Sequence, residues 1–529
     1  MDFSKLNFRN GSSQPLYSQL LEALESAIES GALAIGTRLP SERAMADQLK
    51  VSRTTVMSAY RELEARGLIH SHVGRGTFVS ASPEGTGAPF AWRGKLSRTA
   101  SLHNDPALRL SVSGAGRKDL ISFATGAPFA WRGKVSRTAS LQNDPGLRHV
   151  ISGASHPDLL SFAAGAPAID IFPVKAWQRL TEQALRENPQ EVLGIGPTAG
   201  LPRLRQAIAG RFGAKPDRIL ILSGSQQGLG LISRCLLDPG DAVIIDRPCY
   251  LGAIQLFRAA GAHLIGWDIV RADMGELEDL ILRYRPKLIF TNPTFQNPTG
   301  RSLSLRDRKE LLKLAVRYRV PLLEDDPYRE TYLDGQPPPP LYHLDEHDIV
   351  IYLSTFSKIL APGLRLGWLA APEYIVDQLA LIKQREILFT EGPGQYALSV
   401  FLQSGLFDDH LVRLRTEHAR RRRAFLDALK RHAPARSLKF EVAPGGLYFW
   451  IRADQSLNSW QWSRQALAAG VAFTSGEIFY ADAVSSQQAR FCYTWLPPEK
   501  IEVGVRRLAE TVKTGNSLTA LGHSDIPLV

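Results

Sequence analysis

Residues 349–367 read IVIYLSTFSKILAPGLRLG, and this stretch decides the fold of most of the chain. Its first half is an apolar run that predicts a buried strand. Ser357, Lys358 and Arg365 follow the run directly. A lysine that follows a buried strand, beside groups able to bind an anion, is suited to form a Schiff base with an aldehyde cofactor.

Similar apolar runs lie on both sides of this stretch, and helical patterns separate them. They are RILILSG (218–224), DAVIIDRP (241–248), KLIFTNP (287–293), PLLEDD (321–326) and GWLAAP (367–372). Short apolar strands that alternate with helices predict an α/β fold with a mostly parallel sheet covered by helices on both faces. Ligands of such sheets bind at the carboxyl ends of the strands.

Polar residues stand at those expected strand ends. Ser225 and Gln226 come where RILILSG meets a helix, and the N–H groups of a helix start bind phosphate. Asn297 follows KLIFTNP, and Asp325 and Tyr328 come at the end of PLLEDD. A carboxylate that faces a pyridine nitrogen keeps that ring an electron sink. Each motif alone is more often a turn, a cap or a solvated group, but the whole set with its lysine predicts pyridoxal 5'-phosphate.

Residues 13–80 show three short helical patterns followed by a hairpin. The second helix is expected after Ser41 with Ala44, Met45 and Leu49 inward, and the third after Ser52 with Val56, Tyr60 and Leu63 inward. This order predicts a winged helix-turn-helix whose third helix enters the major groove of double-stranded DNA. The alternative is a small helical protein-interaction module. The expected DNA contacts are Arg43, Arg53, Thr54, Thr55, Ser58 and, at the hairpin tip, Arg75.

Residues 81–158 are expected to form a basic linker between the two parts. Within and just beyond it, residues 87–125 repeat as residues 126–164, with 28 identities in 39 aligned positions. Two copies are too few for a stable repeat stack, so we interpret the pattern as a tandem duplication. The first copy is then surplus and lengthens the connection. The linker as a whole is either a solubilising tether or a segment that helps to hold DNA phosphates.

The length and composition of the chain limit its domain organisation and its classes of partner. With 529 residues the chain requires several domains, and its net charge of +11 makes a polyanionic partner plausible. We expect no membrane span and no secretory signal, and therefore a cytoplasmic protein. Three scattered cysteines argue against disulfides and against a metal site. The run Arg420-Arg421-Arg422-Arg423 on a helix is either a solvated face or, less simply, a DNA-contacting patch.

Known families share these motifs. PLYSQL, VSRTTVMSAYRELEARGLI and GRGTFV resemble the winged-helix domain of the GntR regulators. Residues 159–512 resemble a fold-type I, class I/II aminotransferase, with a large mostly parallel sheet domain and a small α+β domain. The branch is that of aminoadipate and kynurenine aminotransferases. The combination, with a flexible tail expected over 513–529, resembles the MocR/GabR subfamily of GntR transcription regulators.

The resemblance implies roles for the site residues. Lys358 would be the Schiff-base lysine, Asp325 would pair with the pyridine nitrogen, and Tyr250 would stack on the ring. Tyr328 and Asn297 would hydrogen-bond the ring hydroxyl. The phosphate would be held by Ser225, Gln226, Ser357 and Arg365. Arg490 would bind the carboxylate of a ligand. Ile195 stands where the family usually has a tyrosine that reaches the phosphate of the neighbouring subunit, so cofactor affinity or turnover is expected to be reduced unless a nearby group compensates.

The resemblance also implies a function. The aminotransferase-like body, residues 159–512, would form a head-to-tail homodimer. An amino compound, or pyridoxal phosphate itself, would act as the effector. Its amino group would displace Lys358 from an internal aldimine to give an external aldimine. The alternative is a working aminotransferase with a non-essential DNA-binding head. A third, non-enzymatic alternative, a pyridoxal phosphate carrier or an interaction scaffold, is disfavoured by the intact head.

Overall fold

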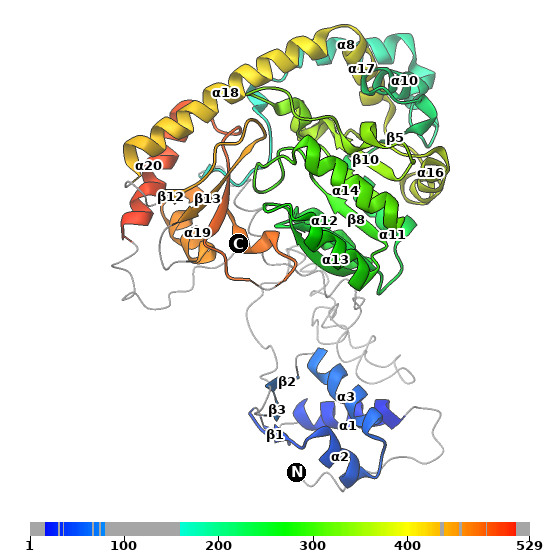
Figure 1. Cartoon of the computed structure of the whole chain (residues 1–529), viewed down its shortest axis with the longest axis vertical. Helices are drawn as coiled ribbons and strands as arrows, with labels where there is room; N and C mark the ends of the chain where they lie inside the picture. Colours follow the sequence, from blue (N-terminus) through cyan, green and yellow to red (C-terminus); the bar gives the residue numbers. More distant parts are fainter. Residues whose placement is uncertain are drawn as a thin grey trace, which may run out of the picture. The chain divides into compact units, whose positions relative to one another are not determined.

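The computed structural model describes residues 16–29, 32–34, 36–65, 68–72, 76–79, 159–433, 438–453, 458–482 and 484–514. These residues fall in two units, an N-terminal head of residues 16–79 and a body of residues 159–514 (Figure 1). The linker expected over 81–158, including the first repeat copy, lies outside the described residues. So does the expected tail beyond Thr514. None of the described helices is both long and apolar enough to cross a membrane.

The body contains the α/β sheet that the apolar runs predict. Its seven strands lie in the order β5-β11-β10-β9-β8-β6-β7, and all neighbours are parallel except at β11, which is antiparallel to β5 and β10. Strand β7 at the edge was not predicted, because exposed and half-buried residues interrupt its apolar pattern. The strands are β5 (Ile219–Leu222), β6 (Ala242–Arg247), β7 (His263–Asp268), β8 (Leu288–Thr291), β9 (Leu322–Asp325), β10 (Val350–Thr355) and β11 (Gly367–Ala370).

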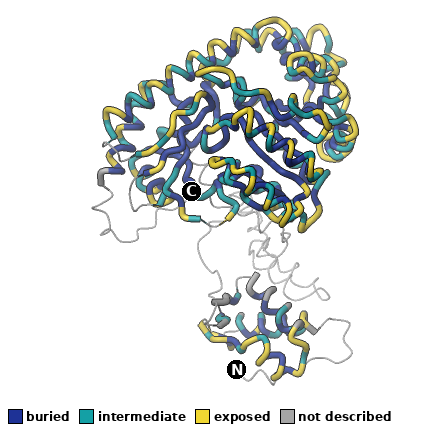
Figure 2. Tube along the Cα trace, in the orientation of Figure 1, coloured by how far each residue is buried: buried dark blue, intermediate teal, exposed yellow. Residues whose placement is uncertain are grey.

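Helices cover both faces of this sheet, and the strands between them are almost wholly buried (Figure 2). One face packs against α11 (Ser225–Leu236), α12 (Leu251–Ala259) and α16 (Glu373–Ile387). The other packs against α10 (Pro202–Phe212), α13 (Met274–Tyr284), α14 (Leu305–Tyr318) and α17 (Gly392–Gln403). Helices α8 (Val174–Glu187), α9 (Pro189–Leu193) and α15 (Leu341–Leu344) complete this layer.

A buried lysine joins α16 to the sheet. The Lys383 ammonium donates to the carbonyls of Thr198, at 2.6 Å, and Ile221, at 2.7 Å. No carboxylate among the described residues pairs with it, and burial lowers the pKa of Lys383 to about 7.

Helix α18 (Leu406–His432) runs from the large domain to the small domain (Figure 1). His410 hydrogen-bonds the carbonyl of Ile359, at 2.7 Å, and His418 accepts from the N–H of Ala168, at 3.3 Å. Both histidines are fully buried, and burial lowers the pKa of each. The helix therefore contacts Ile359, which follows Lys358, near its start. In its middle it contacts Ala168, which lies in the N-terminal arm of the body (residues 162–168).

The small domain is a four-stranded antiparallel sheet with helices packed against it. The strand order is β12-β13-β16-β15, and the core includes Phe162, Phe449 and Phe491. The elements are β12 (Leu438–Lys439), β13 (Tyr448–Ala453), β15 (Thr474–Ser475), β16 (Gln488–Cys492), α19 (Ser459–Ala468) and α20 (Pro498–Thr514). The end of the second repeat copy docks here, because β4 (Leu160–Ser161) pairs with β14 (Val471–Ala472) and Phe162 is fully buried.

The head has the helices of the predicted winged helix-turn-helix and one strand more than predicted. Its elements are α1 (Leu16–Glu29), β1 (Arg38–Leu39), α2 (Glu42–Leu49), α3 (Arg53–Ala65), β2 (Ile69–His72) and β3 (Gly76–Val79). Strand β1 pairs with β3, so the wing sheet has three strands instead of two. Gly36, at φ 82°, turns the chain into this pairing, which the local sequence pattern does not reveal.

The packing of the head follows the expected stripes with one exception. Val56, Tyr60 and Leu63 are buried as predicted. In α2, Met45 and Leu49 are buried, but Ala44 is exposed and Ala46 takes its place. The Ser41 side chain caps α2, accepting from the N–H of Ala44, at 3.3 Å.

Candidate functional site

Lys358 lies where the sheet meets the small domain. It ends the 3-10 turn η8 (Phe356–Lys358), which follows β10. Its Nζ donates to the carbonyl of Gly165 in the N-terminal arm, at 2.6 Å. Burial and the Arg490 guanidinium lower the pKa of Lys358 to about 8, so more of this amine is neutral and nucleophilic near neutral pH than of an ordinary lysine.

Asp325 ends the neighbouring strand β9 and is buried. No described residue hydrogen-bonds its Oδ1 atom. Burial and the Asp326 carboxylate raise the pKa of Asp325 to about 8. A buried carboxylate without a partner is costly, and a cation beside it relieves that cost. The protonated nitrogen of a pyridine ring therefore fits this position.

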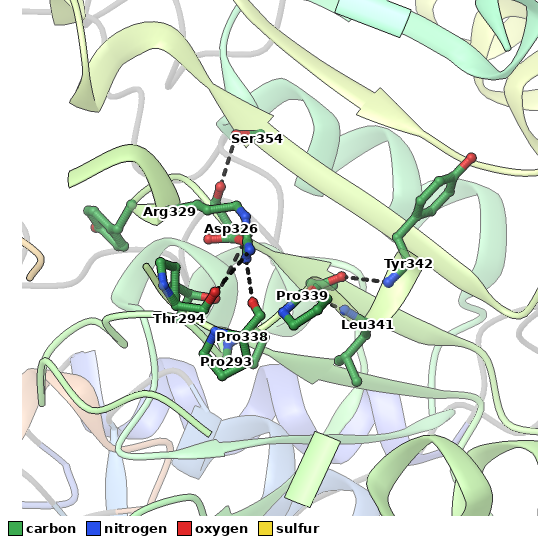
Figure 3. A network of polar contacts seen from close by, with 12 residues as sticks. Pro293, Thr294, Asp326, Arg329, Pro338, Pro339, Leu341, Tyr342 and Ser354 are labelled. Atoms are coloured by element: carbon green, nitrogen blue, oxygen red, sulfur yellow. Dashed lines mark hydrogen bonds and ion pairs between the residues drawn. The ribbon is translucent and has the colours of Figure 1, made fainter. Parts of the chain in front are cut away.

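Strand alternation separates Asp325 from its two acidic neighbours. Glu324 and Asp326 point to the opposite side, where buried Arg308 lies 3.5 Å from Glu324. Glu324 also accepts from the N–H groups of Leu341 and Tyr342. Figure 3 shows this network, in which Asp326 receives the Thr294 hydroxyl, at 3.4 Å, and lies beside Arg329. Hydrogen bonds and ion pairs thus hold the outer two carboxylates in the fold, although Oδ1 of Asp326, like Oδ1 of Asp325, has no hydrogen-bond partner among the described residues.

A cradle suited to phosphate lies at the start of α11. Gly224 adopts φ 90°, and a Cβ atom placed on it would lie 2.6 Å from Nη2 of Arg365. Arg365 donates to the Ser223 carbonyl, at 3.1 Å. The side chain of Ser357 is held by the Thr355 hydroxyl, at 3.0 Å. Only glycine at position 224 allows the guanidinium to come this close to the N–H groups of the helix start.

Tyr250 and Gln226 lie together beside this cradle. The Tyr250 hydroxyl donates to Oε1 of Gln226, at 3.0 Å. A Cβ atom on Gly252 would lie 2.6 Å from the Tyr250 ring, so the glycine permits the position of that ring. Burial raises the pKa of Tyr250, which keeps the phenol neutral.

Arg490, on β16, is buried between two aromatic rings. Its guanidinium carbon lies 4.4 Å from the ring centre of Tyr448 and 5.1 Å from that of Phe479. Nη1 donates to Oδ1 of Asn297, and Nη2 donates to the Ala163 carbonyl, both at 2.9 Å. Its Nε has no partner within the described part of the chain. A buried arginine with a spare donor is suited to bind a carboxylate.

A second layer of side chains fixes Asn297 and Asp325. The Asn292 side chain accepts from the N–H of Asn297, at 2.7 Å, and donates to the Asp325 carbonyl. The N–H of Asn292 in turn donates to Asp246, at 2.7 Å. Burial raises the pKa of Asp246 to about 7.

The structure adds Tyr448 and Gly165, which the sequence reasoning missed. The hydroxyls of Tyr448 and Tyr328 are 3.1 Å apart, and both side chains are buried. Tyr448 begins a strand within an apolar run, where an aromatic residue usually belongs to a core. The preceding pair Gly445-Gly446 was the available signal, since glycines before a strand often permit a close approach of the backbone.

The head brings some of the predicted DNA contacts into view. Arg53 starts α3, has a side chain 71% exposed, and forms an ion pair with Glu42 at 3.4 Å. Arg43 is exposed on α2. The Thr55 hydroxyl hydrogen-bonds that of Ser52, at 2.8 Å, so it takes part in the start of the helix. The side chains of Thr54 and Ser58, and all of Arg75, lie outside what the structure describes.

The four consecutive arginines on α18 do not form one surface. Arg421 is fully buried and binds Asp170, Glu417 and the Thr494 carbonyl. The other three form ion pairs with Glu417 (Arg420), Asp334 (Arg422) and Asp427 (Arg423). A wholly solvated face does not describe this run, because the Arg421 guanidinium holds Asp170, α18 and the small domain together. DNA contact by the exposed Arg420 and Arg423 stays a prediction.

Comparison with known proteins matches both parts of the chain. Residues 157–508 match the family model "Aminotransferase class I and II", and residues 16–79 match "Bacterial regulatory proteins, gntR family". The probable rhizopine catabolism regulatory protein MocR of Rhizobium meliloti is 31% identical over 503 residues, which cover 93% of each chain.

Two solved structures resemble the body. The α-aminoadipate aminotransferase LysN of Thermus thermophilus, in complex with N-(5'-phosphopyridoxyl)-L-leucine, has 32% identity and a TM-score of 0.70. It covers 74% of this chain and all of its own. The kynurenine aminotransferase of Pyrococcus horikoshii has 32% identity and a TM-score of 0.69, with 74% and 99% covered. With its gntR-type head and its class I and II aminotransferase body, the chain belongs to the GntR regulators of the MocR/GabR group.

Proposed function

We propose that the chain is a pyridoxal phosphate-dependent transcription regulator that senses an amino compound at Lys358. One observation carries this proposal. Lys358, the unpaired Asp325 carboxylate and the spare donor of Arg490 converge on one buried site, in a chain that also has a winged-helix head.

The residues present fit the cofactor. Ser225, Gln226, Ser357 and Arg365 would hold the phosphate, Asp325 the ring nitrogen, and Tyr328 and Asn297 the ring hydroxyl. Pyridoxal phosphate supplies an aldehyde that reacts with amines and a ring that withdraws electrons. Lys358 holds or releases a proton at Nζ close to neutral pH, and Arg490 orients a carboxylate beside it. The effector class is therefore an amino compound, favoured when it carries a carboxylate.

The cofactor assignment is tested by absorbance of the purified full-length chain. Lys358→Ala should abolish the visible band of bound pyridoxal phosphate, because no other amine replaces Nζ at this position. Lys309→Ala removes an exposed lysine on α14 and serves as the control. An unchanged band in the Lys358 variant would disprove the assignment.

DNA recognition by the head is tested by sequencing the DNA that the protein retains, with and without pyridoxal phosphate. In gel shifts Arg53→Ala should weaken specific binding by about 1–3 kcal/mol if Arg53 pairs with a guanine edge. Arg385→Ala, at an exposed arginine on α16 of the body, is the control. Wild-type binding by both Arg53→Ala and Arg75→Ala would exclude the head from the mechanism.

Dimerisation through the body is the second part of the proposal. Leu193, Ile195 and Leu388 are 68%, 94% and 60% exposed. A Cβ atom on Gly196 would lie 3.4 Å from the Phe389 ring, so the two segments that carry these residues are adjacent. A second copy of the chain, arranged head to tail, would cover this apolar surface. Ile195→Asp should lower the mass measured by analytical ultracentrifugation, whereas Val442→Asp, at another exposed apolar residue, should not.

A working aminotransferase is the competing candidate, favoured by the lowered pKa of Lys358, which suits a base that moves protons. The test is conversion of a mixture of amino acids and 2-oxo acids by the purified protein. Sustained turnover at about 1 per second or faster, within the usual enzyme range, would favour catalysis over sensing.

A further inference from the structure

The Tyr448 phenol lies at the candidate site, but none of the cofactor-binding or ligand-binding roles proposed so far uses it. It begins β13, immediately after Gly445-Gly446 and Leu447, and is 1% exposed. Its ring meets that of Tyr328 edge to face, with centres 5.6 Å apart, and the two hydroxyls are 3.1 Å apart. The Tyr448 ring also contacts the guanidinium of Arg490.

The Tyr448 hydroxyl also borders the space around the reactive amine. A Cβ atom on Gly165 would lie 2.6 Å from the Tyr448 oxygen and 3.7 Å from Nζ of Lys358. The two phenol oxygens and the amine therefore line one small volume, and no side chain at position 165 divides it.

The number of hydroxyl protons determines which of the two phenols can donate the hydrogen bond between them. Each has one proton to donate, and within the described residues each hydroxyl has only the other as a hydrogen-bond partner. Burial raises the pKa of both, so both keep their protons at neutral pH. If Tyr328 donates its proton to a ligand, the proton between the two oxygens has to come from Tyr448.

We propose that Tyr448 is a positioning residue whose hydroxyl donates to Tyr328 and thereby directs the Tyr328 proton to the ring oxygen of bound pyridoxal phosphate. This inference rests on the proposed function. Hydrogen bonds in a chain strengthen one another, so Tyr448 makes Tyr328 a better donor. A better donor stabilises negative charge on the ring oxygen, and the nitrogen of Lys358 then holds its own proton less tightly.

The consequence is a spectroscopic one. Tyr448→Phe keeps the ring that contacts Arg490 and removes only the hydroxyl. The absorbance of bound pyridoxal phosphate changes with pH as the Lys358 nitrogen loses its proton, and the midpoint should rise in this variant by about 0.3 to 1 pH unit. Tyr328→Phe should raise the midpoint further, because it removes the direct donor.

The experiment compares full-length wild type, Tyr448→Phe, Tyr328→Phe and the double variant, each loaded with pyridoxal phosphate. Because Tyr448 acts through Tyr328, the double variant should titrate like Tyr328→Phe alone. Tyr493→Phe is the control, since it removes a buried hydroxyl that bonds the Gly446 carbonyl, at 2.6 Å, and does not bond the hydroxyl of Tyr328 or Tyr448. Tyr448→Met, which fills the space with a flexible apolar chain, replaces the Phe variant if that one does not fold.

Two results would overturn the inference. One is a Tyr448→Phe midpoint equal to that of wild type and of the Tyr493→Phe control, in protein that binds the cofactor normally. The other is a shift that adds fully to that of Tyr328→Phe, which would show that Tyr448 acts independently. Absence of cofactor from the wild-type protein would instead refute the proposed function, and this inference with it.

Discussion

Gly165→Ala tests the geometry of the site most directly, because one added methyl group meets one identified atom. The Cβ atom would lie 2.6 Å from the Tyr448 oxygen, closer than real side-chain carbons come to any neighbour. Tyr448 is 1% exposed and contacts both Tyr328 and Arg490, so it has little room to withdraw. Overpacking of this kind costs about 1–3 kcal/mol, to which loss of the phenol hydrogen bond adds about 1 kcal/mol.

The clash depends on a single oxygen, so a double-mutant cycle isolates it. In the Tyr448→Phe background the nearest remaining atoms are the ring carbon that bore the oxygen and Nζ of Lys358, both at 3.7 Å, an ordinary contact distance. Gly165→Ala should then cost less than about 0.5 kcal/mol, which leaves a coupling energy of about 1.5 kcal/mol or more.

The assay is urea unfolding of the body in the full-length protein, with near-ultraviolet circular dichroism as the signal. Gly210→Ala is the matched control, since nothing lies within 4 Å of its added Cβ atom in helix α10. That variant should gain about 0.5–1 kcal/mol in both backgrounds and show no coupling to Tyr448. Equal destabilisation by Gly165→Ala with and without the Tyr448 hydroxyl would refute the geometry.

Three further outcomes are expected. Asp325→Asn should weaken pyridoxal phosphate binding but stabilise the cofactor-free protein by about 1–3 kcal/mol at pH 7. Because the pKa of Asp325 is raised to about 8 in the folded state, the wild-type protein should lose stability as the pH rises from about 4 to about 8. Unfolding measured over this pH range should show no such loss in the variant. The free energy of unfolding of Lys383→Met should rise relative to that of wild type as the pH falls from 10.5 to about 7, because in this range Lys383 gains a proton only in the unfolded wild-type chain. Below about pH 7 the difference between variant and wild type should stay constant. A difference that does not change with pH over the whole range would contradict the lowered pKa of Lys383. Deletion of residues 87–125 should preserve the fold and cofactor binding and change only the half-site spacing accepted in gel shifts, and a variant unable to bind pyridoxal phosphate would show the first copy to be structural.

The sequence predicted those features that depend on local order. Apolar runs located six of the seven strands of the large sheet, and the polar residues after them located Lys358, Asp325 and Arg365. The strand assignments succeeded because a parallel α/β sheet gathers its strand ends at one edge, whatever the details of packing, whereas the cofactor-binding roles of these three residues stay predictions.

The features that were missed depend on contacts between distant segments. The role of Gly165 depends on Tyr448, which is almost three hundred residues away, and strand β1 depends on its pairing with β3. The burial of Arg421 similarly depends on Asp170 and on backbone carbonyls of the small domain, so a run of four arginines looked more uniform than it is. Periodicity does not report contacts of this kind.

Helix α18 has a mechanical consequence for a protein that senses a ligand. From His410, which is bonded beside the Lys358 segment, the helix continues for 22 residues to His432 in the small domain, roughly 33 Å at 1.5 Å per residue. Rotation by about 5° about the His410 contact would therefore displace the far end by about 3 Å. A small rotation of α18 beside the reactive amine of Lys358 would therefore produce a displacement of several ångströms where the helix ends in the small domain.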